Sequence, residues 1–263
     1  MNEDEKYLFD LNGYLVLREV LATEEVKQLN DGIDQHISQL NEMDRSLSGS
    51  SKALAGTSHR KNMGGMLSWE QPWCEPYRNL LVHPAIKPYL EEILGEGYRL
   101  DHGPGLIAMD SGCEGGTLHG GGVERVNLSE AYFFKHGRIY TGLTVVEFLL
   151  ADEGPGDGGV SVIPGSHKAN LPCPKRMKHW EKYQEHVLEL NGQAGDAVIF
   201  TETLTHGTLP WTADHQRRAL LYKFSPGYSA YSPGAHTIAY PEYIESMTDE
   251  QREVMEAPHI RRP

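Results

Sequence analysis

Two histidines and one arginine are the residues whose types and spacing could do chemistry. His119 lies in the glycine-rich segment 118–122, where backbone and metal could approach closely. His206 follows the apolar run 197–201 at an expected strand end, and Arg217 comes eleven residues later. Imidazoles are common metal ligands, although a lone histidine is more often a surface or satisfied core residue. The order His, long gap, His, Arg raises the odds of a metal site with an anion beside it.

Arg217 and Arg218 begin the apolar stretch 219–222. Successive side chains of a strand point to opposite faces, so only one of the two arginines can point into a barrel. An arginine held inside an apolar barrel needs an anion, and a carboxylate fits its fork in a bidentate manner. The alternative is two exposed arginines at a strand edge.

The elements that must position these residues change character along the chain. Helical spacing predicts an amphipathic helix over about 22–40, capped by Thr23, and a helical block over roughly 75–94 that ends at Gly95. After a short strand near residues 14–18, the strands come mainly from the second half, between glycine clusters. They are expected at 105–109, 140–150, 160–163, 187–190, 197–201 and 218–224. Helices followed by many short strands indicate an antiparallel barrel or sandwich with flanking helices.

The 263 residues are expected to form one domain. Within 1–263, residues 1–96 would pack helical and strand elements on the barrel, 97–228 would form the core, and 229–263 a tail with one short helix. The Ser-, Gly- and Asn-rich segment 45–67 is expected to act as a lid together with 110–137.

Composition excludes several classes of partner. The net charge of −13 without a basic run argues against nucleic acid. No apolar stretch is long enough for a signal peptide or membrane helix. Three scattered cysteines argue for a reducing compartment, so a cytoplasmic protein is expected. A small-molecule substrate remains, and the sequence does not indicate an oligomeric state.

Three motifs carry a resemblance to a known family over roughly residues 8–228. They are Gly13-Tyr14-Leu15-Val16-Leu17, the loop 156–159 running into Val162-Ile163-Pro164-Gly165-Ser166-His167-Lys168, and Ala194-Gly195-Asp196-Ala197-Val198-Ile199-Phe200 followed by His206. In these the chain resembles the phytanoyl-CoA dioxygenase family of iron(II)- and 2-oxoglutarate-dependent oxygenases. The resemblance implies a double-stranded β-helix, which is a cupin-like jelly roll with helices packed outside.

The resemblance also implies a site. His119 matches the first iron ligand and His206 the distal one. Arg217 matches the residue that holds the far carboxylate of 2-oxoglutarate, and Thr208 a hydroxyl that supports the same carboxylate. Two imidazoles and one carboxylate leave room on iron(II) for the oxo acid and dioxygen. His167 matches a position on a surface loop outside the metal centre and is expected to be structural.

Gly121 departs from the family pattern, which has an iron-binding aspartate there. Four interpretations stay open. Chloride could fill the vacant position, as in related aliphatic halogenases. Another carboxylate could replace the aspartate. Glu147, which interrupts the apolar run 143–150 and should not be buried without a partner, is the preferred candidate, with Glu124 and Glu202 as weaker ones. Water could fill the position, or the protein could be a non-catalytic jelly-roll binding module.

The preferred function is an iron(II)/2-oxoglutarate-dependent dioxygenase that hydroxylates an unactivated carbon of a small molecule, with succinate and CO2 as coproducts. An isomerase or epimerase using the same cofactors is a rival. The glycines at 120–122 are interpreted either as a flexible turn or as a wall without side chains beside the metal.

Overall fold

The computed structural model describes residues 1–120, 131–231 and 241–259. The strands are β1 (Tyr14–Leu17), β2 (Asn41–Glu42), β3 (Lys61–Gly64), β4 (Arg99–Met109), β5 (Gly116–His119), β6 (Tyr132–Lys135), β7 (Arg138–Thr141), β8 (Thr144–Leu149), β9 (Gly159–Val162), β10 (Leu188–Glu189), β11 (Ala197–Thr201), β12 (His206–Leu209) and β13 (Arg217–Ser225). The α-helices are α1 (Glu3–Asn12), α2 (Thr23–Gln35), α3 (Glu75–Asn79), α4 (Lys87–Leu94), α5 (Lys175–Lys178) and α6 (Asp249–Val254). Short 3-10 helices are η1 (Ile37–Gln39), η2 (Met66–Ser68), η3 (Leu80–Val82), η6 (Ser166–Lys168), η7 (Gln184–His186) and η8 (Glu242–Ser246).

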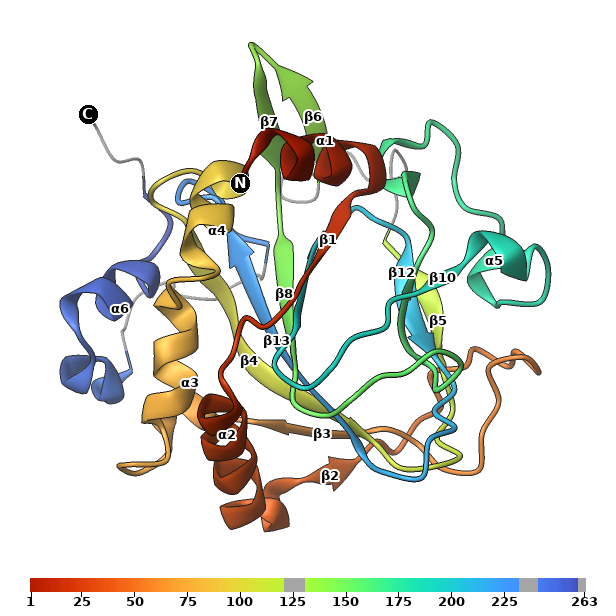
Figure 1. The fold of residues 1–263 in the computed structure, drawn as a ribbon, viewed down its shortest axis with the longest axis horizontal. Coiled ribbons are helices and arrows are strands. Elements are labelled where there is room, and N and C mark those ends of the chain that lie inside the picture. The colour runs from red at the N-terminus through yellow and green to blue at the C-terminus, as the bar shows by residue number, and fades with distance from the viewer. Residues whose placement is uncertain (121–130, 232–240, 260–263) are drawn as a thin grey trace.

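Two antiparallel sheets face each other (Figure 1). The larger one has seven strands in the order β1-β11-β8-β13-β4-β3-β2, and the smaller one has four in the order β10-β9-β12-β5. Strands β11 and β12 are consecutive in the chain but belong to different sheets, so the turn between them crosses the space that separates the sheets. The predicted jelly roll with flanking helices is confirmed.

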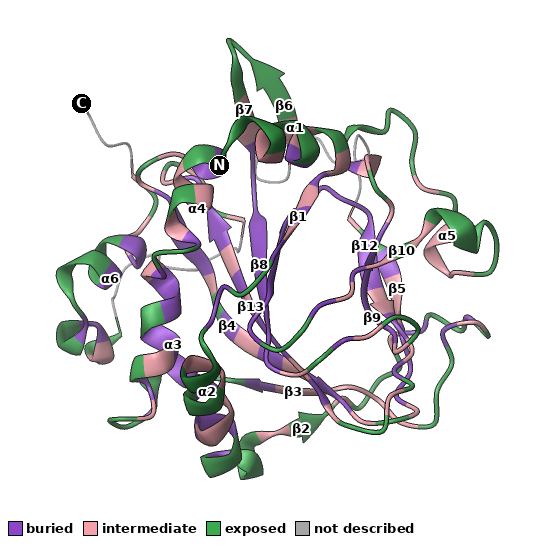
Figure 2. Ribbon diagram, in the orientation of Figure 1, coloured by how far each residue is buried: buried purple, intermediate pink, exposed green. Residues whose placement is uncertain are grey.

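Strand β8 is buried along its whole length because both of its faces are covered (Figure 2). Val145 packs between the two sheets, with Val160 and Val162 of β9. The alternate residues Val146 and Phe148 face the opposite way, into the core beneath the helices. Side-chain alternation therefore places Glu147 on the inner face, between the sheets.

Helices α2, α3 and α4 cover the outer face of the large sheet (Figure 1). Leu29 and Ile33 of α2, Tyr77 of α3 and Leu90 of α4 are buried in one core with Phe148. The predicted helix 22–40 is found as α2 and η1, and its N-cap is Ala22 rather than Thr23, with the Glu25 carboxylate accepting from the Ala22 N–H. The block 75–94 is found as α3, η3 and α4, and it ends at Gly95 as expected.

The first 96 residues do more than pack on the barrel, because they contribute β1, β2 and β3 to the large sheet. Helix α1, which the sequence analysis did not predict, precedes β1. None of the helices within the described ranges has the length and apolar character that crossing a bilayer requires.

Candidate metal and oxo-acid site

The two predicted histidines are direct neighbours across two strands. His119 is the last residue of β5 and His206 the first of β12, and the two are paired in the antiparallel register. Their ring centroids lie 4.3 Å apart. His206 is buried, whereas His119 lies at the open side of the site. The pairing brings together two imidazoles that are 87 positions apart in the sequence.

Backbone carbonyls fix how each imidazole is presented. Nδ1 of His206 lies 2.7 Å from the Leu204 carbonyl, and Nδ1 of His119 lies 3.2 Å from the Thr117 carbonyl. A ring that donates its Nδ1–H to a carbonyl keeps the lone pair on Nε2, which is the arrangement that orients metal-binding histidines. Both rings thus present Nε2 as the free ligand atom.

Glu202 supplies a carboxylate at the same place. It lies in the turn between β11 and β12, and its Oε1 is 3.9 Å from Nε2 of His206. Potential ligand atoms of His119, Glu202 and His206 all lie within 4.8 Å of one another, which we call the histidine–carboxylate cluster. The other carboxylate oxygen of Glu202 is 3.0 Å from Nζ of Lys223, so one oxygen is held and one faces the histidines.

The protonation states suit a metal site. Burial lowers the pKa of His206 to about 4, with a further contribution from His119, and burial also lowers the pKa of His119. Both rings are therefore neutral near pH 7, as metal ligands must be. Burial alone would raise the pKa of Glu202, but the charge that His206 carries when protonated and the Lys223 ammonium outweigh burial, so the pKa is lowered and the carboxylate stays ionised.

The cluster opens into a cavity of about 390 Å³ between the sheets, which we call the central cavity. Its walls combine apolar side chains with a few charged ones. The lining residues are Leu47, Arg60, Ile107, Gly116, Thr117, His119, Val145, Glu147, Val160, Phe200, His206, Gly207, Thr208, Arg217, Leu221 and Lys223. Such a mixture, mostly apolar with convergent polar groups, is typical of a small-molecule site. Thr208 and Arg217 thus line the same cavity as the two histidines.

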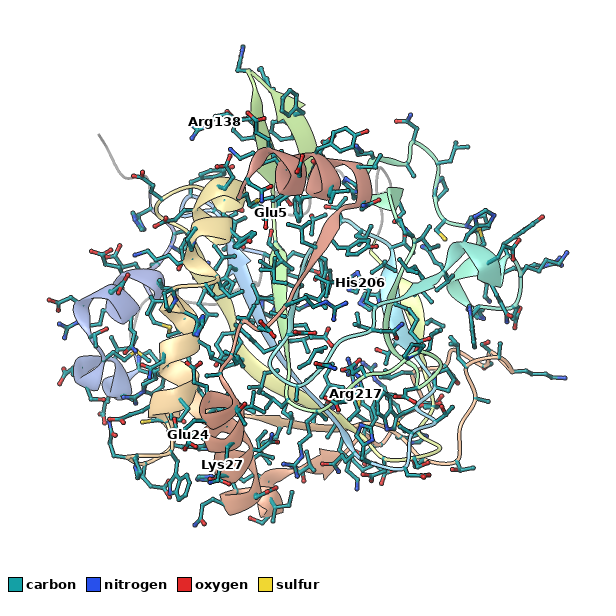
Figure 3. All side chains as sticks on the ribbon, viewed as in Figure 1. Glu5, Glu24, Lys27, Arg138, His206 and Arg217 are labelled. Atoms are coloured by element: carbon teal, nitrogen blue, oxygen red, sulfur yellow. The ribbon has the colours of Figure 1, made fainter. Side chains whose placement is uncertain are left out.

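Arg217, labelled in Figure 3 with His206, is buried. It already has two acidic partners. Its Nη2 donates a hydrogen bond to Oε1 of Glu147, and its Nε lies 2.9 Å from Oε1 of Glu153 without the alignment of a hydrogen bond. We call these three residues the arginine–carboxylate cluster. Burial raises the pKa of Glu153 to about 7, because the charged form loses more solvation than Arg217 restores. Arg218 points to the other face and pairs with Asp34, as strand alternation predicted.

Glu147 was the preferred candidate for the missing metal ligand, and the structure gives it a different partner. It is buried and faces the interior, as expected, but its carboxylate binds the Arg217 guanidinium and is not part of the histidine–carboxylate cluster. Glu202, one of the two weaker candidates, lies beside the two histidines instead. The reason is that the turn 202–205 folds back beside His206, which strand alternation alone does not reveal.

Two glycines are required by close backbone approaches around the site. Gly120 has φ +76°, and a Cβ there would lie 2.5 Å from the carbonyl oxygens of Glu202 and Leu204. Gly159 has φ +92°, and its Cβ would lie 2.3 Å from a carboxylate oxygen of Glu153. Gly120 thus packs against the turn that carries Glu202. Gly121, the position of the absent aspartate, lies outside the described residues, as do Gly122 and the other weaker candidate, Glu124.

The segments expected to form a lid supply part of the cavity wall. Leu47 and Arg60 come from 45–67, which also contains β3, while 110–137 contains β5 and His119. His167 is buried rather than exposed on a surface loop. Its Nε2 lies 3.1 Å from the Asp10 carbonyl, where it joins η6 to the end of α1. It does not line the central cavity, in keeping with a structural role.

Several solved structures share this fold at low sequence identity. HygX from Streptomyces hygroscopicus with nickel and 2-oxoglutarate bound is 19% identical, with a TM-score of 0.70, over 88% of this chain and 89% of that chain. HygX with nickel, 2-oxoglutarate and hygromycin B bound is 18% identical, with a TM-score of 0.69, over 88% and 89%. SnoK, a non-heme alpha-ketoglutarate-dependent carbocyclase from nogalamycin biosynthesis, is 14% identical, with a TM-score of 0.64, over 94% and 91%.

A comparison with curated protein sequences gives no match. The comparison with protein families gives one, and it covers the part of the chain that holds the site. Residues 117–219 match the model of the phytanoyl-CoA dioxygenase (PhyH) family. That segment contains His119, Glu202, His206, Thr208 and Arg217, so the family match and the geometry fall on the same residues.

Proposed function

We propose that this protein is an iron(II)- and 2-oxoglutarate-dependent dioxygenase that hydroxylates an unactivated carbon of a small molecule, giving succinate and CO2 as coproducts. The observation that carries the proposal is the histidine–carboxylate cluster at the wall of the central cavity. The family match over residues 117–219 and the fold shared with 2-oxoglutarate-binding HygX support it.

The donor set fits iron(II). Two neutral imidazoles and one carboxylate form the set typical of non-heme iron oxygenases, in which further coordination positions stay open. Ligand atoms that are each about 2.1 Å from one ion and at right angles around it lie about 3.0 Å apart, so the 3.9 Å between His206 Nε2 and Glu202 Oε1 would shorten by about 0.9 Å when both bind one ion. Bound iron would activate dioxygen. The oxidative decarboxylation of the oxo acid would supply two of the four electrons that dioxygen takes up, and the substrate would supply the other two.

Neighbouring groups of the chain already orient the side chains that would bind the metal. The carbonyls of Thr117 and Leu204 hold the two rings so that each Nε2 faces the metal position. Lys223 holds one oxygen of Glu202 and so favours monodentate binding through the other. The apolar walls exclude water from part of the cavity, and Thr208 and Arg217 lie among the polar groups available to an oxo acid.

Glu202 also favours hydroxylation over halogenation. A halide would need a coordination position that the protein leaves vacant, and a carboxylate ligand from the turn 202–205 would fill the position that Gly121 leaves empty. The expected hydroxylase is therefore indifferent to chloride. The solved structures with a similar fold include a carbocyclase and an epimerase, so enzymes of this fold catalyse different reactions. The products must therefore be identified to tell hydroxylation from these alternatives.

The function is tested by adding iron(II) and 2-oxoglutarate to the protein without oxygen and recording the weak visible charge-transfer band of the complex. Oxygen is then admitted, and succinate and the products from a pool of small molecules are identified by mass spectrometry. A hydroxylase gives the band, succinate and a product heavier by one oxygen atom. A binding module gives neither band nor succinate. A halogenase shows a chloride-sensitive band and a chlorinated product.

The third ligand is tested separately with cobalt(II), whose visible spectrum reports coordination. Glu202→Gln should weaken cobalt binding at least about 10-fold and change the spectrum, because removal of a ligand costs at least as much as removal of an outer-shell partner. Glu147→Gln should leave both unchanged. The opposite pattern would assign the ligand to Glu147 and refute the assignment to Glu202.

A further inference from the structure

Helix α1 and the hairpin of β6 and β7 adjoin at one end of the molecule, and both expose apolar side chains (Figure 1). At the base of the hairpin the Tyr132 hydroxyl donates a hydrogen bond of 2.6 Å to the Asp10 carboxylate of α1. Ten large apolar or aromatic side chains are exposed in the described part of the chain. Five of these belong to the two elements, namely Tyr7, Leu8, Leu11, Phe133 and Phe134. Such a concentration on adjoining elements is typical of a surface that binds another macromolecule.

Helix α1 exposes an apolar stripe with an acidic end. Tyr7 and Leu8 are four and three residues before Leu11, so the three side chains lie along one side of the helix. Glu3 and Asp4 lie one turn earlier and are exposed. Neither has an ion-pair partner within the described ranges. We call these five residues the helix patch.

The hairpin is aromatic with a basic tip. Phe133 stacks on Tyr140 across the two strands, with ring centroids 5.0 Å apart, and Phe134 is 64% exposed. Lys135 and Arg138 are paired in the register at the tip, and neither meets a carboxylate of the described residues. A two-stranded ribbon that belongs to neither large sheet has little stability of its own, so it gains from a partner. We call Phe133, Phe134, Lys135 and Arg138 the hairpin patch.

The two patches have opposite charge, and each combines that charge with apolar side chains. Tyr132 and Phe134 are alternate residues of β6, so they share the face of the hairpin that Tyr132 turns toward α1. The described part of the chain has no ion pair between the two patches, so neither neutralises the other within one protomer. A surface that carries both halves of a complementary pair can bind a copy of itself about a two-fold axis, which forms each contact twice.

We propose that a second copy of this chain covers this surface, in a two-fold dimer that packs the hairpin patch of each protomer on the helix patch of its partner. Charge favours this partner over an anionic membrane. The whole chain carries a net charge of −13, so a membrane that attracted the basic tip would repel most of the protein. A second copy offers the acidic helix patch at the place where the tip needs it.

The test measures the mass of the full-length protein by sedimentation equilibrium over a wide range of protein concentration. The wild type should be a dimer whose Kd rises with added salt. Lys135→Glu with Arg138→Glu reverses the hairpin patch, and Glu3→Lys with Asp4→Lys reverses the helix patch. Each pair should raise the Kd of the dimer at least about 100-fold, because like charges would face each other across the interface. An equimolar mixture of the two variants should dimerise again, since both contacts of the mixed dimer then join opposite charges.

Lys175→Glu with Arg176→Glu is the matched control, because it makes the same change of charge at two exposed cations of α5, away from both patches (Figure 1). It should leave the Kd of the dimer unchanged, and circular dichroism should show that every variant is folded. A wild type with the mass of one chain at every concentration would overturn the proposal. Binding of that monomer to phosphatidylserine vesicles would assign the hairpin to a membrane. A mixture that stays monomeric would refute the pairing of the two patches. The experiment needs neither metal nor oxo acid, so its result is independent of the proposed function.

Discussion

Glu153 gives the structure its clearest pH-dependent prediction. Its side chain is 1% exposed and lies against Arg217, which it shares with Glu147. One guanidinium cannot compensate two buried carboxylates, and burial raises the pKa of Glu153 to about 7. The substitution Glu153→Gln keeps the shape of the side chain and removes its ionisation, so it isolates the cost of that charge.

Glu153 binds its proton more tightly in the folded protein than in the unfolded chain. Between pH 4.5, the ordinary pKa, and about 7, the folded protein holds a proton on Glu153 that the unfolded chain releases. The free energy of unfolding therefore falls as the pH rises through this window. At about 1.4 kcal/mol per pH unit the fall attributable to Glu153 is about 3 kcal/mol. The Glu153→Gln variant lacks this contribution, so it gains stability relative to wild type as the pH rises.

Urea unfolding of the metal-free protein at pH 5, 6, 7 and 8, followed by the fluorescence of tryptophans such as the buried Trp211, measures the difference. The free energy of unfolding of wild type minus that of Glu153→Gln should decrease by about 2.5 kcal/mol from pH 5 to pH 8, since part of the total fall lies below pH 5. Glu181→Gln, at an exposed glutamate, should give a flat difference. A flat difference for Glu153→Gln as well would refute the reasoning, since it would mean that the folded state keeps this carboxylate ionised throughout.

Four further variants test the packing around the two clusters. Gly159→Ala should reduce the free energy of unfolding by at least about 2 kcal/mol in urea titration, because its φ is +92° and the added Cβ would meet the Glu153 carboxylate. Arg217→Met should reduce it by about 3–5 kcal/mol at pH 8, since two buried carboxylates lose their counter-charge, and Arg217→Met combined with Glu147→Gln should recover part of the loss. Gly120→Ala should weaken cobalt(II) binding measured by absorbance, because its Cβ would push away the turn that carries Glu202.

The large elements could be predicted because their signals are local. Helix α2 and the end of α4 at Gly95 follow from apolar spacing and a glycine cap. Helix α1 was missed although its signal was present. Asn2 accepts from the Glu5 N–H and Glu5 accepts from the Asn2 N–H, which is the reciprocal capping that begins a helix.

Strand alternation predicts which face of a strand each site residue occupies, but it predicts nothing more about the site. Alternation puts Arg217 and Arg218 on opposite faces, and the structure has Arg217 inside and Arg218 outside. It does not say which interior groups meet, because that depends on how strands far apart in sequence are paired. A more specific signal was available: Glu202 precedes His206 by four residues, in a short turn between two strands. Once those strands are assigned to opposite sheets, that turn crosses from one sheet to the other directly before His206.

Gly121, two residues after His119, does not by itself mean that the site lacks a carboxylate. A glycine at 121 in place of an aspartate indicates a lost ligand only if the carboxylate has to come from β5 or its continuation. The turn from β11 to β12 places Glu202 beside the two histidines, and Gly120 packs against that turn. Under the proposed function Glu202 supplies the carboxylate ligand, so no aspartate is required at 121. A Gly121→Asp variant should therefore displace Glu202 from cobalt(II) rather than add a fourth protein ligand.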